Sequence, residues 1–410
     1  MPAIRFFPVQ EYLFRYTDLD DYEIAWNNLN QIAMNYSEDL AGRPFDPERS
    51  PARIRLQLEG ATTFVPEEGP NAGETLYTGG SITKVSFFSE ANQLQVQITD
   101  IDFPLSTFQS MVTVGELFRT YDAFVAGGST FNGSRISDDI ATGFGDDRVF
   151  AGAGNDYIKD KGGSDRYFGG AGDNDTVTYD EWFWDNPEQV ISGIDVDLAQ
   201  ERVIGPDGNR DFLRSIEEVR GTFTDDVFRG DGNDNGFYGL GGEDFFDGRG
   251  GFDIIYYRRD DDQGGTAGVR VNMFTREARD GFGQIDTFVN IEGAVGSNTN
   301  DVFDDAAGDN YYDGRDGDDW FYIARGNDVI RGNEGADRFF FRGNNFGDNE
   351  IRDFERSEGD LISIRNASSF GDLTITDNGN GDAVIAFANG TVTVEGWSES
   401  ELMASDFIFV

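Results

Sequence analysis

The chain of 410 residues has room for two or more domains, and its 38% hydrophobic residues suffice to build a core. Its 77 Asp and Glu residues against 32 Lys and Arg residues give a formal net charge of −45, which argues against nucleic acid or an anionic membrane as a partner. The sequence has no Cys and no His, which excludes disulfides, His-dependent catalytic triads and most zinc or iron sites. We therefore expect a folded protein whose compact state depends on cations to offset its own charge.

Residues 1–135 predict a β-rich N-terminal domain with some helix, which serves as an assembly module or as a cap. Apolar residues alternate with polar ones over residues 54–58 and 94–98, as in half-buried strands. The spacing of apolar residues over residues 18–34 predicts a short helix, and a second helix is predicted over residues 106–124. The first residues lack the apolar run of a Sec signal peptide, and no stretch is apolar enough to span a membrane as a helix.

The dominant feature from residue 136 onwards is a residue, nearly always Asp, that recurs every nine positions. In the first block it is Asp138, Asp147, Asp156 and Asp165. In the second block it is Asp226, Asn235, Asp244 and Asp253, and in the third Asp301, Asn310, Asp319, Asp328 and Asp337. An apolar or aromatic residue follows two positions later, and a glycine precedes most of them by two positions. Because glycine permits tight turns with positive φ, the pattern predicts short stacked strands in a parallel β-roll with two repeats per coil.

The roll is predicted to contain an internal duplication. Residues 193–198 match residues 268–273 at an offset of 75, and Asn235 falls on Asn310 at the same offset. The predicted segments are a first block at 136–180, an insert plus second block at 181–258, an insert plus third block at 259–342, and a C-terminal segment at 343–410. In the last segment, alternating apolar residues and Asn-Gly turns predict paired β-hairpins.

Stacked coils place the repeat aspartates in rows along the turns. Rows of carboxylates repel one another unless a hard divalent cation lies between them. Calcium suits such rows because it accepts six or more oxygen ligands with loose geometry, from carboxylates and from turn carbonyls. The predicted cofactor is therefore several Ca2+ ions. The predicted fold class is all-β: calcium-stabilised parallel β-rolls in three blocks, a β-rich N-terminal domain with some helix, and a C-terminal β-hairpin cap.

The segments GFGDDRV, GAGNDYI and GNDVI, which begin at Gly143, Gly152 and Gly326, resemble the RTX (repeats-in-toxin), or haemolysin-type, calcium-binding family. The resemblance covers roughly residues 136–410. It implies that the repeat aspartates supply carboxylate ligands and that glycines two and four positions earlier supply carbonyl ligands. The implied metal-binding residues are Asp138, Gly143, Gly145, Asp147, Gly152, Gly154, Asp156, Gly163, Asp165, Asp226, Gly242, Asp244, Gly251, Asp253, Asp301, Gly308, Gly317, Asp319, Gly326, Asp328, Gly335 and Asp337.

Some positions depart from the family pattern. Lys161 and Arg315 stand where the family usually has glycine, and Asn235 and Asn310 lack a charge. An extra residue within 173–175 interrupts the period at the end of the first block. Calcium sites at these positions are expected to be weak or empty.

The C-terminal segment resembles the uncleaved signal that type I secretion systems recognise. The residues that carry this likeness are the DF pair at Asp353, the GDLI segment at Gly359 and the final DFIF segment at Asp406. The resemblance implies export by that machinery, a secreted or cell-surface location, and folding on extracellular calcium, because metal binding contributes folding free energy directly.

We interpret the sequence as that of a non-enzymatic structural or interaction protein at the cell surface or in the extracellular matrix, acting alone or self-assembled into a layer or filament. No catalytic or organic-cofactor site is predicted. The alternative hypothesis is a carbohydrate-binding or carbohydrate-modifying RTX protein, of adhesin, glycosidase, lyase or epimerase type. Trp182 and Trp184 either form a sugar-stacking platform or pack as a hydrophobic plug on the flank of the roll. The predicted partners are calcium, the type I secretion machinery during export, and either a second copy of the chain or a surface polysaccharide.

Overall fold

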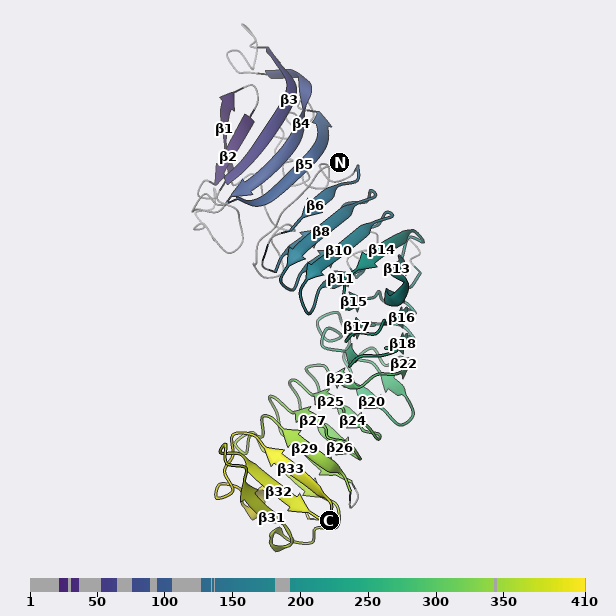
Figure 1. Cartoon of the computed structure of the whole chain (residues 1–410), viewed down its shortest axis with the longest axis vertical. Coiled ribbons are helices and arrows are strands. Elements are labelled where there is room, and N and C mark those ends of the chain that lie inside the picture. Colours follow the sequence, from purple (N-terminus) through teal and green to yellow (C-terminus); the bar gives the residue numbers. More distant parts are fainter. Residues whose placement is uncertain are drawn as a thin grey trace. The chain divides into compact units, whose positions relative to one another are not determined.

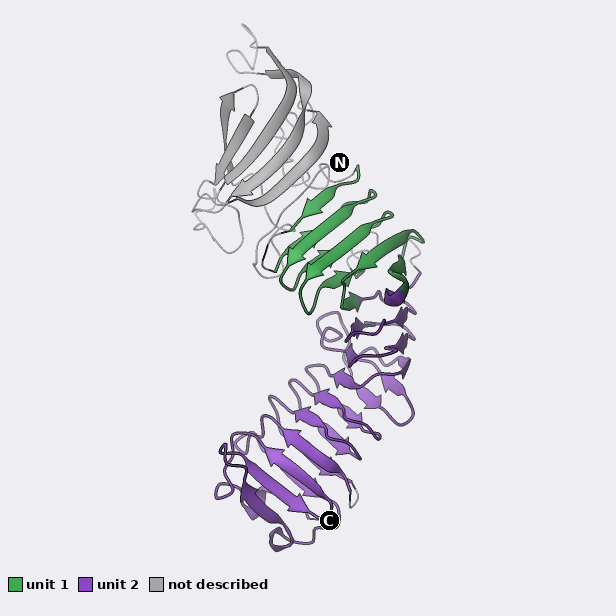
Figure 2. Ribbon diagram, viewed as in Figure 1, with its two compact units in different colours: residues 1–191, 200–219 green, residues 192–199, 220–410 purple. Residues whose placement is uncertain are grey.

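A computed structural model describes residues 127–133, 135, 137–180, 192–342 and 345–409, together with the backbone of five strands nearer the N-terminus (Figure 1). The chain divides into two compact units, one formed by residues 1–191 and 200–219 and the other by residues 192–199 and 220–410 (Figure 2). We call them unit 1 and unit 2. The described residues are nearly all in strands and turns, with a few short 3-10 helices, so the predicted all-β class is confirmed.

The N-terminal strands form one antiparallel sheet in chain order. These strands are β1 (Tyr22–Asn28), β2 (Gln31–Tyr36), β3 (Arg53–Phe64), β4 (Leu76–Phe88) and β5 (Leu94–Pro104). The strands predicted over residues 54–58 and 94–98 lie in β3 and β5.

The helix predicted over residues 18–34 is wrong, because β1 and β2 form a hairpin there. Ile24 pairs with Met34 and Trp26 pairs with Ile32. These residues also alternate with polar ones, so the same short segment fits a period of two, and strand pairing decides the outcome. The second predicted helix, over residues 106–124, lies outside the described residues.

Unit 1 contains the first part of the roll. Its strands are β6 (Thr130–Asn132), β7 (Asp139–Ala141), β8 (Arg148–Ala153), β9 (Tyr157–Lys159), β10 (Arg166–Ala171), β11 (Thr176–Thr178), β13 (Arg202–Ile204) and β14 (Arg210–Arg214). Strands β6, β8, β10 and β14 pair in parallel in one sheet, and β7, β9 and β11 pair in parallel in the other. Val149 faces Tyr167 across the β8–β10 pair, which confirms that two nonapeptides make one coil.

Unit 2 has the same architecture, with its strands divided between the two sheets of the roll. Its first sheet contains β12 (Asp195–Asp197), β16 (Val227–Arg229), β18 (Phe245–Asp247), β20 (Arg270–Asn272), β21 (Glu277–Arg279), β22 (Ile285–Val289), β24 (Val302–Asp304), β26 (Trp320–Ile323), β28 (Arg338–Phe341) and β30 (Leu361–Ile364). Its second sheet contains β17 (Gly236–Tyr238), β19 (Ile254–Tyr256), β23 (Gly293–Val295), β25 (Tyr311–Asp313), β27 (Val329–Arg331), β29 (Gly347–Ile351), β31 (Thr374–Asp377), β32 (Ala383–Phe387) and β33 (Gly390–Val394). The last three strands are antiparallel to their chain neighbours and form hairpins at one end of that sheet.

The inserts supply hairpins at matching places. The β13–β14 hairpin of unit 1 and the β21–β22 hairpin of unit 2 are both antiparallel, and their strands begin 75 residues apart. Strand β15 (Glu218–Arg220) likewise precedes β23 by 75 residues. The structure thus repeats the offset that the sequence shows. The division into domains remains a prediction.

The core is a stack of the side chains that follow each repeat residue by two positions. Phe228 and Phe246 stack at 5.0 Å between ring centroids, and Phe321 stacks on Phe303 and Phe339 at 5.1 and 5.3 Å. All five rings are fully buried. Burying each ring contributes about 1.5–3 kcal/mol, and each stacked pair about 0.5–1.5 kcal/mol more. These stacked rings align neighbouring coils and so help to fix the positions of the turns between them.

Candidate calcium-binding edges

The repeat aspartates lie in rows in which a backbone amide donates to the carboxylate one coil further on. In unit 1 the amide of Asp138 donates to Asp156 Oδ1 at 2.8 Å, 18 residues away. In unit 2 the amides of Asp301 and Asp319 donate to Oδ1 of Asp319 and Asp337 at 2.7 and 2.9 Å. All eleven repeat aspartates named from the sequence are at most 3% exposed. The structure thus brings the predicted aspartates together in aligned rows and buries them.

The rows continue across the inserts through acidic residues that the nine-residue period does not reveal. The amides of Asp165 and Asp244 donate to Oδ1 of Asp211 and Asp286 at 2.9 and 3.0 Å. Other residues that extend the rows are Asp175, Glu217, Glu292, Asn349 and Asp360. Two pairs of them, Asp211 with Asp286 and Glu217 with Glu292, are 75 residues apart, so the duplication was the signal that could have found them.

The aspartate row continues past the end of the first block, although the nine-residue period is interrupted there. Asp175 lies 19 residues after Asp156 and accepts the Asp156 amide at 2.8 Å. Strand β11 pairs with β9 at the same offset, with Thr176 opposite Tyr157. That calcium sites here are weak or empty stays a prediction.

The second carboxylate oxygen of many row aspartates has no hydrogen-bond partner among the described residues. These buried oxygens are Oδ2 of Asp156, Asp175, Asp244, Asp253, Asp319, Asp328 and Asp337. Several of them lie directly over a glycine five positions earlier: a Cβ on Gly314 would be 2.0 Å from Asp319 Oδ2. A buried, unpaired carboxylate oxygen is costly unless it gains a proton or a cation.

Burial raises the pKa values of these carboxyls, and their neighbours raise them further. The pKa of Asp319 rises to about 9, first through burial and then through the charge of Asp301. The pKa values of Asp147, Asp328 and Asp337 rise to about 8, with burial again the main cause. Without a bound cation, the folded rows hold protons that an open chain would release.

The glycines of the turns lie against the backbone of the preceding coil. Gly335 has a φ of 136°, and a Cβ there would be 2.0 Å from the carbonyl oxygen of Gly317. Gly163 lies over the carbonyl of Gly145 in the same way, and the amide of Gly143 donates to Asp147 Oδ2 at 2.8 Å. The other predicted turn glycines with positive φ are Gly152, Gly154, Gly242, Gly251, Gly308, Gly317 and Gly326. Carbonyl oxygens are therefore stacked between successive turns, beside the aspartate rows.

The residues that depart from the family pattern occupy the same places in rows and turns as the residues they replace. The backbone amides of Asn235 and Asn310 donate to Oδ1 of Asp253 and Asp328 at 2.8 and 2.9 Å. Each Asn therefore keeps its place in a row without a charge. Arg315 has a φ of 74° where glycine would be unstrained. Lys161 donates its amide to Thr142 Oγ1 at 3.3 Å.

Unit 1 also contains a compact cluster of three aspartates that the nine-residue period does not predict. Asp160, Asp165 and Asp211 are buried, and each offers an oxygen within 4.8 Å of the others. The hydroxyl of Tyr167 lies 2.5 Å from Asp160 Oδ1 and 2.7 Å from Asp165 Oδ2, and Tyr179 donates to Asp211 Oδ2 at 3.0 Å. Asp160 occupies a position five before a repeat aspartate, where most repeats have glycine.

The residues present fit calcium. The rows and turns offer only oxygen, from carboxylates and carbonyls, and many of those oxygens are buried and unpaired. Hard oxygen donors in flexible number are what calcium prefers, and the chain has no Cys or His to offer a softer ligand. The candidate ligands are the row aspartates and the turn glycine carbonyls. Trp182 and Trp184, named as a sugar-stacking platform or plug, lie outside the described residues.

Comparison with known proteins agrees with this chemistry. A family profile described as the RTX calcium-binding nonapeptide repeat matches in four copies, at residues 141–175 and 324–345. The chain thus contains RTX repeats of the calcium-binding type within these residues. No curated protein matches the chain.

Two solved structures are similar to parts of it. The extracellular lipase LipA from Serratia marcescens has 16% identity, and the match covers 69% of this chain and 40% of the lipase with a TM-score of 0.20. The AlgE6R3 subunit of the Azotobacter vinelandii mannuronan C5-epimerase has 19% identity, and the match covers 46% of this chain and 79% of that subunit with a TM-score of 0.17. The chain therefore spans two fifths of the lipase. In the part of the chain that the structure describes, no helix has the length and apolar character of a membrane span.

Proposed function

We propose that this is a secreted, non-enzymatic structural protein of the cell surface or extracellular matrix, whose roll folds when it meets calcium outside the cell. The proposal rests on one observation: each row buries carboxylate oxygens, the Oδ2 atoms, that have no hydrogen-bond partner among the described residues. Such rows are unstable as bare anions, so the folded state needs a cation that accepts many oxygens.

The same rows account for export in an unfolded state. Extracellular calcium modules bind with a Kd of about 10⁻⁴ to 10⁻³ M, far above the free calcium inside a cell. With a net charge of −45, the chain repels itself until calcium offsets part of that charge. Type I secretion, which passes unfolded chains, is therefore compatible with a chain that folds only after release.

A structural role is favoured over catalysis by the distribution of the chemistry. Among the described residues, the buried acidic groups recur along the rows of each unit rather than gathering around one cleft. The chain has no His or Cys to serve as base or nucleophile. A regular surface of stacked coils suits a layer, filament or matrix component.

The test is a calcium titration of the purified chain, from EGTA into millimolar calcium, followed by circular dichroism, light scattering and electron microscopy. A gain of β structure together with ordered particles or filaments supports the whole proposal. A gain of β structure with a monomer at saturating calcium supports calcium-driven folding and overturns self-assembly. The same spectrum in EGTA and calcium overturns the proposal.

A further inference from the structure

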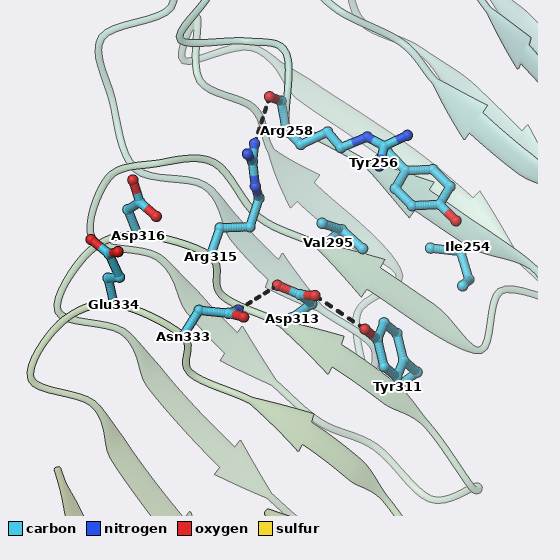
Figure 3. A pocket seen from close by; sticks show the side chains of 10 residues that line it. All are labelled: Ile254, Tyr256, Arg258, Val295, Tyr311, Asp313, Arg315, Asp316, Asn333 and Glu334. Atoms are coloured by element: carbon cyan, nitrogen blue, oxygen red, sulfur yellow. Dashed lines mark hydrogen bonds between the residues drawn. The ribbon is translucent and has the colours of Figure 1, made fainter. Parts of the chain in front are cut away.

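We propose that unit 2 carries a saccharide-binding pocket on the outer face of its second sheet. The pocket has a volume of about 650 Å3, lies over β23, and is bounded by Tyr256, Arg258, Val295, Tyr311, Asp313 and Arg315 (Figure 3). We call it the β23 pocket. Its size falls within the usual range of ligand sites, about 300–1,000 Å3. It goes beyond the proposed structural role, because a hollow in a stacked sheet contributes nothing to calcium binding.

The pocket lies over β23, which has smaller residues than its neighbours on either side, and Val295 is the β23 residue that lines it. Gly293 pairs with Ile254 of β19 on one side and with Tyr311 of β25 on the other. Val295 lies in the same way between Tyr256 and Asp313. Side chains alternate between faces along a strand, so the buried Ala294 points into the core and Val295 faces the pocket.

The duplicated copy of this region is filled. Glu218 and Arg220 of β15 stand 75 residues before Gly293 and Val295. Glu218 is buried and accepts the hydroxyl of Thr176 at 3.1 Å. Arg220 is also buried, and its guanidinium lies 4.6 Å from the centroid of Tyr238. The two copies thus keep the same strand pairing but differ in the side chains at these two positions.

The walls of the β23 pocket are rigid polar groups. Arg258 lies over Tyr256, with 4.9 Å between its guanidinium carbon and the ring centroid, and its carbonyl accepts Arg315 Nη1 at 2.7 Å (Figure 3). Asp313 accepts Asn333 Nδ2 at 2.8 Å and the Tyr311 hydroxyl at 3.1 Å. These bonds hold donors and acceptors in place before any ligand arrives, which lowers the cost of binding.

Arg315 lines the pocket from a turn whose backbone has a positive φ. Its φ is 74°, and the counterpart turn residue 75 positions earlier, Leu240, has a φ of 67°, so this conformation belongs to the turn in both copies. The difference between the copies is the side chain, because Arg315 places a guanidinium at the hollow.

The mixture of groups selects the ligand class. Arg258 and Arg315 disfavour a cation, while Asp313, Asp316 and Glu334 disfavour a phosphate or another dense anion. Strand β23 is paired on both sides, so no free edge remains for an added peptide strand. A polyhydroxylated ligand uses both kinds of group because every hydroxyl both donates and accepts, and the tyrosine rings offer a surface to the apolar face of a sugar.

A second hollow indicates a ligand of more than one sugar ring. It has a volume of about 250 Å3, and Ile254 and Tyr311 line both hollows. Its other walls include Phe252 and Val329. Tyr311 therefore stands between two adjoining hollows, as a residue would that contacts consecutive rings of an oligosaccharide.

The test is binding of the calcium-loaded full chain to an array of defined neutral and uronic-acid oligosaccharides, with affinities then measured by calorimetry for the oligosaccharides retained. Arg315→Gly restores the usual turn residue and removes the guanidinium, so it should fold at least as well as the parent and bind roughly tenfold to a hundredfold more weakly. Val295→Arg imports the residue of the filled copy and should abolish binding. Arg276→Gly is the matched control, because Arg276 also has a positive φ, 61°, but is exposed outside the pocket.

The results separate the possibilities. Retention of oligosaccharides by the parent and by Arg276→Gly, but not by Arg315→Gly or Val295→Arg, supports the proposal, and the neutral and acidic arms then show which sugars bind. No retained oligosaccharide at millimolar concentration overturns it. Equal binding by the parent and Arg315→Gly also overturns it, because the sugar then binds elsewhere.

Discussion

The backbone amide of Asp319 donates to Oδ1 of Asp337 at 2.9 Å, while Oδ2 of the same Asp337 has no partner among the described residues. One carboxylate therefore has two roles: one oxygen sets the register of neighbouring coils, and the other remains for a cation. Asn310 keeps its place in the row through its backbone amide, which donates to Asp328 Oδ1, and it lacks the charge.

Asp319→Asn should separate these two roles. The amide oxygen still accepts the Asp301 amide, so the roll keeps its register, while the row loses one buried charge. In EGTA we expect unchanged or higher stability, because the pKa of Asp319 is raised to about 9 and its charged form is unfavourable in the fold. In calcium, a tenfold loss of affinity at one site reduces the stabilisation by about 1.4 kcal/mol. Thermal unfolding in both conditions measures the difference.

The matched control is Glu277→Gln, which removes one charge from an exposed strand position. It should change stability in calcium by less than about 0.5 kcal/mol. Equal losses of calcium stabilisation in the two variants would show that net charge, and not position in the row, governs binding.

The pH dependence of folding should have opposite signs with and without calcium. Burial first, and neighbouring carboxylates second, raise the pKa of Asp328 to about 8, and burial raises the pKa of Asp156 to about 7, both above the ordinary value of 3.8. A raised carboxyl pKa favours folding below the unfolded value and loses that contribution as pH rises through the folded value. In EGTA, β structure should therefore decrease as pH rises from about 4 to 8.

In calcium the protons compete with the metal, so stability should rise with pH over the same window. Circular dichroism and thermal unfolding at pH 5, 6, 7 and 8 in each condition measure both trends. Stability in EGTA that increases with pH would contradict the burial of charged rows.

Much of this architecture could be predicted because the repeat combines three signals that agree. Glycine, aspartate and an apolar residue recur at fixed spacing, so Phe246 and Phe321 could be assigned to the core and Asp244 and Asp319 to the rows from sequence alone. The structure places all four as expected. Periodicity is strong here because every coil makes the same contacts with its neighbours.

The nine-residue period alone could not predict the rest, because it depends on how inserts of different length return to the roll. Asp211 follows Asp165 by 46 residues, whereas Asp286 follows Asp244 by 42, so no fixed period connects them. The helix predicted over residues 18–34 fails for a different reason, since pairing between Ile24 and Met34 outweighs a weak helical spacing. The β23 pocket lies over Val295, and the sequence alone does not show that Tyr256 and Asp313 flank this residue.

Gly335→Ala should destabilise the roll far more than an alanine elsewhere in the turns. The added Cβ would lie 2.0 Å from the carbonyl oxygen of Gly317, and the φ of 136° is unfavourable for any residue with a Cβ. We expect a loss of at least about 2 kcal/mol from backbone strain and displaced turns. Gly232→Ala is the control, since a Cβ there meets nothing within 4 Å, and it should change stability by less than about 0.5 kcal/mol. Chemical denaturation in calcium compares them, and equal effects would show that successive turns are not in close contact.

Arg356→Ala should loosen the end of the chain. Arg356 donates to both carboxylate oxygens of Asp406 at 2.6 and 2.7 Å, and its Nη2 donates to the carbonyl of Glu401 at 2.7 Å. The guanidinium also lies 4.5 Å from the ring centroid of Trp397. Asp406 is fully buried, so loss of its partner leaves an uncompensated charge, and because the arginine is 34% exposed we expect a cost of about 2 kcal/mol.

Hydrogen exchange of residues 398–409 in calcium measures this effect directly, because local opening should increase there before the rest of the roll responds. Arg352→Ala is the matched control: it pairs with Glu350 at 3.1 Å, but both side chains are 36% exposed, so its loss should cost less than about 1 kcal/mol. Increased exchange only in Arg356→Ala would show that one buried ion pair attaches the C-terminal residues to the roll. Equal exchange in both variants would mean that the packing of Phe407 against Phe370, at 5.4 Å between centroids, is sufficient to hold them.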